Sequence, residues 1–190
     1  MIEVEIRGKL SPKEYSRLRG FFGKEGKKVE EHKREMYLLF DYPGYSHDPT
    51  ERKIDIRLRN TDGFCEIMLK RKVSTGNQAR EEVSLPLKEN TLDKAKEVVK
   101  ALGCKKGLKM IREKLVYEHE GIEWSLVNCP PKDIKYYEAE IVVENKDESE
   151  EKRKELVAAA EKLGVKVLND ERMKEFIYML DKEVNEVVEL

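Results

Sequence analysis

Along many segments of this chain, apolar and charged side chains alternate, so that the charges of each segment fall on one face. The first case is residues 2–9, where Ile2, Val4 and Ile6 alternate with Glu3, Glu5 and Arg7. A period of two residues is that of a β-strand with one buried face. Further strands are predicted at about 29–42, 52–60, 63–72, 80–87, 107–119, 121–128 and 134–144.

Turn and helix signals suggest how these strands are connected. Asp62-Gly63 and Glu120-Gly121 each separate two predicted strands and favour tight hairpins. Helices are predicted from Ser11 to Gly23, over 91–102, and from 147 onward with a break at Gly164. No Pro/Gly/Ser-rich linker divides the chain, so residues 1–190 are expected to form a single domain. We predict an α+β fold: a closed or nearly closed eight-stranded antiparallel β-barrel, or tunnel, with peripheral helices.

The overall composition gives the chain little net charge. Its 190 residues include 38 Lys and Arg against 39 Asp and Glu, which argues against a general attraction to nucleic acid or anionic membranes. Cys65, Cys104 and Cys129 are widely spaced and match neither a disulfide framework nor a zinc site. No membrane span or signal peptide is evident, so we expect a cytoplasmic protein, either a monomer or a homodimer.

The charged faces of the strands are the most informative feature for function. On any single strand, a charged face is most simply a solvated face. If the sheet curls into a barrel whose outside is covered by the apolar stripes of the helices, the charged faces line the interior instead. Buried cations then need carboxylates, water and an anionic ligand to stabilise them.

The two signs of charge suit two different ligands. Arg binds phosphate through two parallel hydrogen bonds, and Lys acts as a mobile point charge. Paired carboxylates suit Mg²⁺ or Mn²⁺, which prefer oxygen ligands. If the first and last strands of the sheet approach one another, four carboxylates meet there: Glu3, Glu5, Glu138 and Glu140.

These residues also resemble a known family, the CYTH or triphosphate tunnel metalloenzymes, which include class IV adenylyl cyclases, thiamine triphosphatases and inorganic triphosphatases. Residues 3–7, Glu-Val-Glu-Ile-Arg, are similar to the family signature Glu-x-Glu-x-Lys, with Arg7 in place of Lys. Further similar runs are 37–41, 56–59, 67–70, 80–82, 111–112 and 137–140, in family order over about residues 2–145. The acidic residue that the family often has before its last Glu-x-Glu strand is not evident at 124–128.

The resemblance implies a divalent-metal-dependent enzyme that acts on a small-molecule triphosphate. Its implied triphosphate-binding residues are Arg7, Arg57, Arg59, Lys70 and Arg112. From the charged strand faces, Lys72, Arg80 and Lys114 are predicted to bind the triphosphate as well. Glu3, Glu5, Glu138 and Glu140 would hold Mg²⁺ or Mn²⁺, and Lys70 and Arg7 would be catalytic. Three activities remain open: a phosphohydrolase for inorganic, thiamine or nucleoside triphosphate, a class IV-type adenylyl cyclase that releases pyrophosphate, and a non-catalytic polyphosphate- or nucleotide-binding module.

Overall fold

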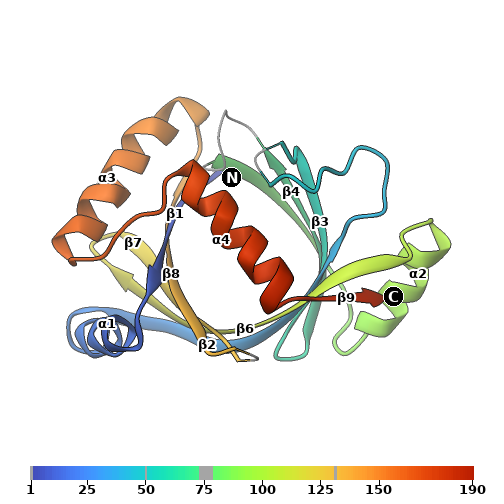
Figure 1. The fold of residues 1–190 in the computed structure, drawn as a ribbon, viewed down its shortest axis with the longest axis horizontal. Helices are drawn as coiled ribbons and strands as arrows, with labels where there is room; N and C mark the ends of the chain where they lie inside the picture. The colour runs from blue at the N-terminus through green and yellow to red at the C-terminus, as the bar shows by residue number, and fades with distance from the viewer. Residues whose placement is uncertain (1, 50, 73–78, 131) are drawn as a thin grey trace.

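The computed structural model describes residues 2–49, 51–72, 79–130 and 132–190, and its centre is an antiparallel sheet closed into a ring (Figure 1). The ring strands are β1 (Ile2–Leu10), β2 (Lys27–Leu39), β3 (Ile54–Thr61), β4 (Phe64–Lys72), β5 (Ala79–Pro86), β6 (Lys106–His119), β7 (Ile122–Cys129) and β8 (Ile134–Val143). They follow the order β2-β3-β4-β5-β1-β8-β7-β6, and β6 pairs again with β2. The predicted eight-stranded α+β fold is confirmed.

Local sequence explains the hairpins and the first helix. Asp62 and Gly63 have φ angles of 48° and 99°, and Glu120 and Gly121 of 53° and 74°, as tight hairpins of the primed type require. Helix α1 (Pro12–Glu25) begins with a capping box, in which the Ser11 side chain accepts a hydrogen bond from the Glu14 backbone.

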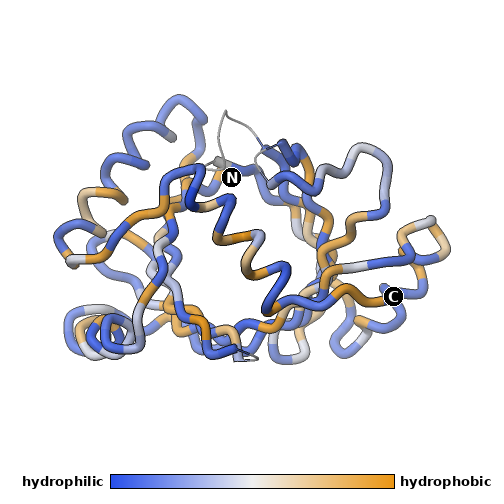
Figure 2. Tube along the Cα trace, in the orientation of Figure 1, coloured by the Kyte–Doolittle hydropathy of each residue, from blue (hydrophilic) through white to orange (hydrophobic). Residues whose placement is uncertain are grey.

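Three helices cover the outside of the sheet, as expected. Besides α1, they are α2 (Leu92–Ala101) and α3 (Ser149–Lys162), which follows the short 3₁₀ turn Lys146–Glu148. The largest core lies beneath α1 and α3, where Phe22, Leu156, Trp124 and Tyr137 are almost fully buried. Figure 2 shows that α1 and α3 are hydrophilic along much of their length, so that each packs through a limited apolar stripe. The apolar face of the sheet therefore points outward, to the helices.

The fourth helix, α4 (Asp170–Glu183), departs from the expectation that the helices cover the outside. It runs across one opening of the ring (Figure 1). Its Phe176 and Leu180 are buried against Val127, Cys129 and Tyr136 of β7 and β8. Val127 and Tyr136 are directly opposite each other on the inner face of the sheet, so α4 packs inside the rim.

A ninth strand was not predicted from the sequence. β9 (Glu186–Glu189) follows α4 and pairs antiparallel with the first residues of β6, Lys106 to Lys109. This pairing holds residues 186–189 against β6, beside the opening that α4 crosses. Within the part of the chain that the structure describes, no helix is both long and apolar enough to cross a membrane.

Candidate functional site

The inner faces of all eight ring strands, together with α4, enclose a cavity of about 280 Å³. Among the described residues, its lining carries ten basic and ten acidic side chains. The basic ones are Arg7, Arg34, Arg52, Arg57, Arg59, Lys70, Arg80, Arg112, Lys114 and Arg153. The acidic ones are Glu3, Glu5, Glu30, Asp55, Glu82, Glu123, Glu138, Glu140, Asp170 and Asp181. A balanced lining suits a ligand that brings both signs of charge, such as a polyanion bound to a metal cation.

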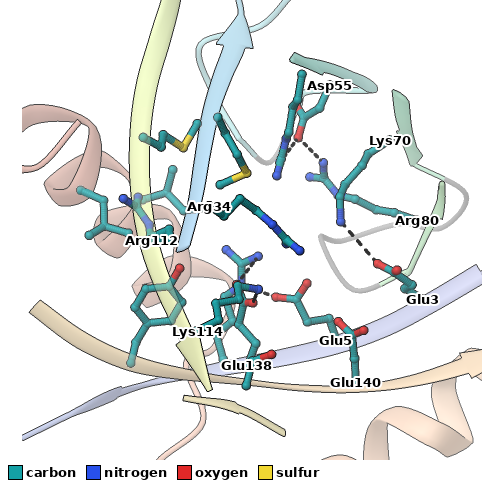
Figure 3. A pocket seen from close by; sticks show the side chains of 18 of the residues that line it. Glu3, Glu5, Arg34, Asp55, Lys70, Arg80, Arg112, Lys114, Glu138 and Glu140 are labelled. Atoms are coloured by element: carbon teal, nitrogen blue, oxygen red, sulfur yellow. Dashed lines mark hydrogen bonds and ion pairs between the residues drawn. The ribbon is translucent and has the colours of Figure 1, made fainter. Parts of the chain in front are cut away.

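The structure brings nearly all the predicted site residues to this cavity (Figure 3). The four glutamates of the predicted metal site line it, and so do all the predicted phosphate-binding residues except one. The exception is Lys72, the last residue of β4, which is not among the described lining residues. The structure thus places these side chains around one cavity, while their roles stay predictions.

Carboxylates gather where β1, β8 and β7 lie side by side. Glu5 on β1 is directly opposite Glu140 on β8, and Glu140 is in turn opposite Glu123 on β7. Burial, together with the charges of Glu3, Glu5 and Glu123, raises the pKa of Glu140 to about 8. Glu123 provides an acidic residue on the strand before the last Glu-x-Glu, one position ahead of the stretch 124–128 where the sequence showed none.

The donor chemistry of this corner fits a hard divalent cation, which would relieve the repulsion between the carboxylates. Within the described ranges, however, no three His, Cys, Asp or Glu side chains are arranged to hold a metal ion. Some of the carboxylates contact basic side chains instead: the Lys70 ammonium lies 3.3 Å from Glu3, and Arg7 contacts Glu5. A cation held by Glu3, Glu5 and Glu140 would therefore replace these contacts.

Glu138 differs from its three predicted partners. It is an ion-pair partner of Lys114, and its Oε1 lies 3.0 Å from Nη2 of Arg7. Although burial alone would raise the pKa of Glu138, Lys114 and Arg7 hold it well below its usual range. Glu138 is thus paired with basic side chains in this structure. Glu123, which was not predicted as a site residue, lies opposite Glu140 in the acidic corner.

Opposite the acidic corner, a buried carboxylate organises several arginines. The Asp55 side chain is only 1% exposed, and Arg57 and Arg80 both donate to its Oδ2 at 2.7 Å. Arg52 approaches Oδ1 at 3.4 Å. These guanidinium groups hold the pKa of Asp55 well below its usual range, against the effect of burial. The sequence offered a signal that was missed, because Asp55 shares a strand face with Arg57 and Arg59.

The basic side chains retain hydrogen-bonding capacity. The Nε atoms of Arg57 and Arg59 are buried, and within the described residues neither has a hydrogen-bond partner. Burial lowers the pKa of Lys70 to about 8, with Glu3 opposing this and Arg57 reinforcing it. Buried donors without partners are costly, so the site is suited to an anion that supplies acceptors.

Comparisons with known proteins agree with this architecture. PH1819 from Pyrococcus horikoshii is similar to this chain at 23% identity with a TM-score of 0.71, over 93% of this chain and 98% of that one. PH1012 from the same organism is similar at 19% identity with a TM-score of 0.69, over 87% and 94% of the two chains. HpAC1 from Hippeastrum, a candidate adenylyl cyclase described as having a dominant triphosphatase activity, is similar at 17% identity with a TM-score of 0.57, over 87% and 89%.

At these identities the solved structures establish the fold alone. No curated protein matches the sequence. The model of the CYTH domain matches residues 1–173, which include every ring strand and most of the lining of the cavity. This chain therefore belongs to the CYTH domain family.

Proposed function

We propose that this protein hydrolyses a triphosphate-bearing substrate inside the ring, with Mg²⁺ or Mn²⁺ as cofactor. The observation that supports this most strongly is that one cavity holds both a cluster of carboxylates and the Nε donors of Arg57 and Arg59, which have no hydrogen-bond partner among the described residues. Arginine forks match phosphate oxygens, while carboxylates match a hard cation that bridges to those oxygens.

Each group of residues has a task in such a reaction. Arg57, Arg59 and Arg112 would hold phosphate oxygens, so that the chain of phosphates lies in one orientation. Glu3, Glu5 and Glu140 would hold the metal ion, which would supply positive charge to the phosphate oxygens and a site for the attacking water. Water would form a new bond to the terminal phosphorus as the bond from that phosphorus to the bridging oxygen breaks, so that inorganic phosphate and a proton are released and a diphosphate or its ester remains.

Lys70 and Arg7 remain our proposed catalytic residues. Lys70 lies between the two halves of the site, in contact with Glu3 and Glu82. Its ammonium can stabilise the negative charge that develops on the bridging oxygen as the bond breaks. Arg7 lies between Glu5 and Glu138, from where it can contact phosphate while it keeps both carboxylates in position.

The same site suits a cyclase, in which the 3′-hydroxyl of ATP attacks the α-phosphorus and pyrophosphate leaves. HpAC1, which shares the fold, is described as dominantly a triphosphatase, and this supports testing hydrolysis first. The purified protein should be incubated with tripolyphosphate, thiamine triphosphate and ATP, each with Mg²⁺ or Mn²⁺. Release of phosphate would support the hydrolase. Formation of cyclic AMP and pyrophosphate would show a cyclase instead, and tight binding without any product would show a binding module.

The metal assignment has a separate test in the double variant Glu3→Gln, Glu5→Gln. We expect metal-dependent turnover to fall at least about a hundredfold, because two oxygen ligands lose their charge. The matched control is Glu81→Gln, which removes a 39%-exposed strand carboxylate that pairs with Arg71 and does not line the cavity. Full activity in the double variant would overturn the assignment.

A further inference from the structure

The outer face of β4 and β5 carries apolar side chains outside the hydrophobic cores. Lys70 and Glu82 line the cavity. Their neighbours Leu69 and Val83 therefore point outward, since side chains alternate along a strand, and they lie directly opposite each other. Leu85 points the same way as Val83, and these two side chains are 58% and 47% exposed. Among the described residues, Leu69, Val83 and Leu85 belong to none of the three cores, and we call them the apolar floor.

Two helices lie on either side of the apolar floor. Helix α2 contacts β3 and β4, and α3 contacts β1 and β8. In the sheet, β5 lies between β4 and β1. Figure 1 accordingly shows α2 and α3 on opposite sides of the ring. The floor is thus a strip of sheet between the two helices.

The flank of α2 that borders this strip is also apolar and exposed. Lys96 marks the other flank, because its ammonium lies 4.1 Å from the centre of the Tyr37 ring on β2. At about 100° per residue, Val98 and Leu102 project from the opposite flank, toward the β4 and β5 side of the sheet. Both are exposed, Leu102 to 79%. We call these two residues the apolar wall.

Wall and floor form a step whose two surfaces complement each other. A helix flank is a convex ridge, and the face of a two-stranded segment is a broad surface on which such a ridge can pack. A second copy of this chain supplies both, so each wall can lie on the partner's floor. A twofold axis requires this kind of self-complementary patch.

The charges at the border of the step are balanced as well. Arg71 and Glu81 form a 3.2 Å ion pair on the outer face of β4 and β5, and both are at least partly exposed. Lys94 and Glu97 are exposed on α2 near the wall. Each copy therefore offers both signs of charge to the other, and an identical partner meets no net repulsion.

We propose that this chain forms a homodimer in which the apolar wall of each subunit packs on the apolar floor of the other. The eight residues of β5 span about 27 Å, and two strands cover about 10 Å, so the floor measures roughly 270 Å². Even with the wall added, this is below the roughly 800 Å² per partner of a standard stable complex. The dimer is therefore weak and depends on concentration. It does not rest on the proposed function, because its residues lie outside the cavity.

Sedimentation velocity of the full chain from about 1 to 500 μM tests the dimer. We expect the sedimentation coefficient to rise from the monomer to the dimer value within this range. Val83→Lys on the floor and Leu102→Glu on the wall should each raise the dissociation constant at least about tenfold, because each dimer contains the misplaced charge twice. Val29→Lys is the matched control: Val29 is a 51%-exposed strand valine at the far end of β2, and its replacement should leave the dissociation constant unchanged.

Mixing the two variants tests how the subunits interlock. A dimer of one Val83→Lys and one Leu102→Glu subunit has one unaltered wall on an unaltered floor, and its other contact brings Lys against Glu. An equimolar mixture should therefore dimerise more tightly than either variant alone. A chain that stays monomeric up to about 500 μM would overturn the proposal and leave the face to a different partner. A dimer that both substitutions leave intact, or a mixture that restores nothing, would also overturn it.

Discussion

Among single residues, Asp55 explains how Arg52, Arg57 and Arg80 can lie so close together. Its buried carboxylate accepts from Arg57 and Arg80 and faces Arg52, so it offsets repulsion among cations that the ring forces together. The loss of one member of such a buried group leaves the remaining charges uncompensated. Asp55 is therefore central to stability, although it carries no charge of the sign that would hold phosphate.

We predict that Asp55→Asn lowers the free energy of unfolding by about 3–5 kcal/mol at pH 7. Urea denaturation measures this directly. Asp93→Asn is the control, since the Asp93 side chain is 92% exposed and pairs with Lys96 on the same helix, so its loss should cost at most about 1 kcal/mol. An Asp55→Asn variant as stable as the parent would show that the arginines do not depend on this carboxylate.

The same variant has a pH signature. Because the pKa of Asp55 is lowered in the folded state, its stabilisation is complete above the unfolded-state value of about 3.9 and is lost as the pH falls through the lower folded value. The difference in unfolding free energy between parent and Asp55→Asn should thus be full at pH 7 and narrow below about pH 4. A difference that stays constant into strong acid would contradict this cause.

At the scale of the element, the connection from α3 to α4 is held against β1, and this positions α4 over the opening. Leu168 donates a backbone hydrogen bond to the Arg7 carbonyl at 2.8 Å, and the Tyr137 hydroxyl donates to the Lys166 carbonyl at 3.3 Å. The close approach depends on Gly8. A Cβ at this position would overlap the Lys166 carbonyl oxygen and the Tyr137 ring.

Gly8→Ala should therefore destabilise the protein by about 1–3 kcal/mol through overpacking. Gly20→Ala, the same change on the exposed side of α1, has nothing within 4 Å of the new methyl group and should stabilise by about 1 kcal/mol through helix propensity. Thermal unfolding of both variants would reveal the opposite signs. Two shifts of the same sign would mean that the contact at Gly8 does not constrain this connection.

At the scale of the whole molecule, the sequence predicted what depends on short-range pattern. Strand periodicity and the two Gly-containing hairpins predicted eight strands at about their observed positions along the chain, because period and turn chemistry are local. It did not predict that Glu123 meets Glu140, since that depends on the register of β7 against β8. Phe176 and Leu180 indicated an apolar stripe on α4, but not that its partner would be the inner rim of the ring.

β9 was missed for a related reason. Its four residues follow a helical pattern directly and are too few to show a period, and only the pairing with β6 makes them a strand. Closure of the ring is likewise a property of the whole molecule, since it requires β6 to pair with β2 as well as β7. The inward direction of the charges follows from closure and from the helices outside.

The proposed function requires the interior of the ring to bind a triphosphate together with a divalent cation. Anomalous diffraction from crystals soaked with Mn²⁺ and tripolyphosphate tests it most directly. We expect an anomalous peak within coordination distance of Glu3, Glu5 and Glu140, and phosphate density beside Arg57 and Arg59. Manganese and phosphate found only on the outer surface, with the interior filled by water, would contradict it.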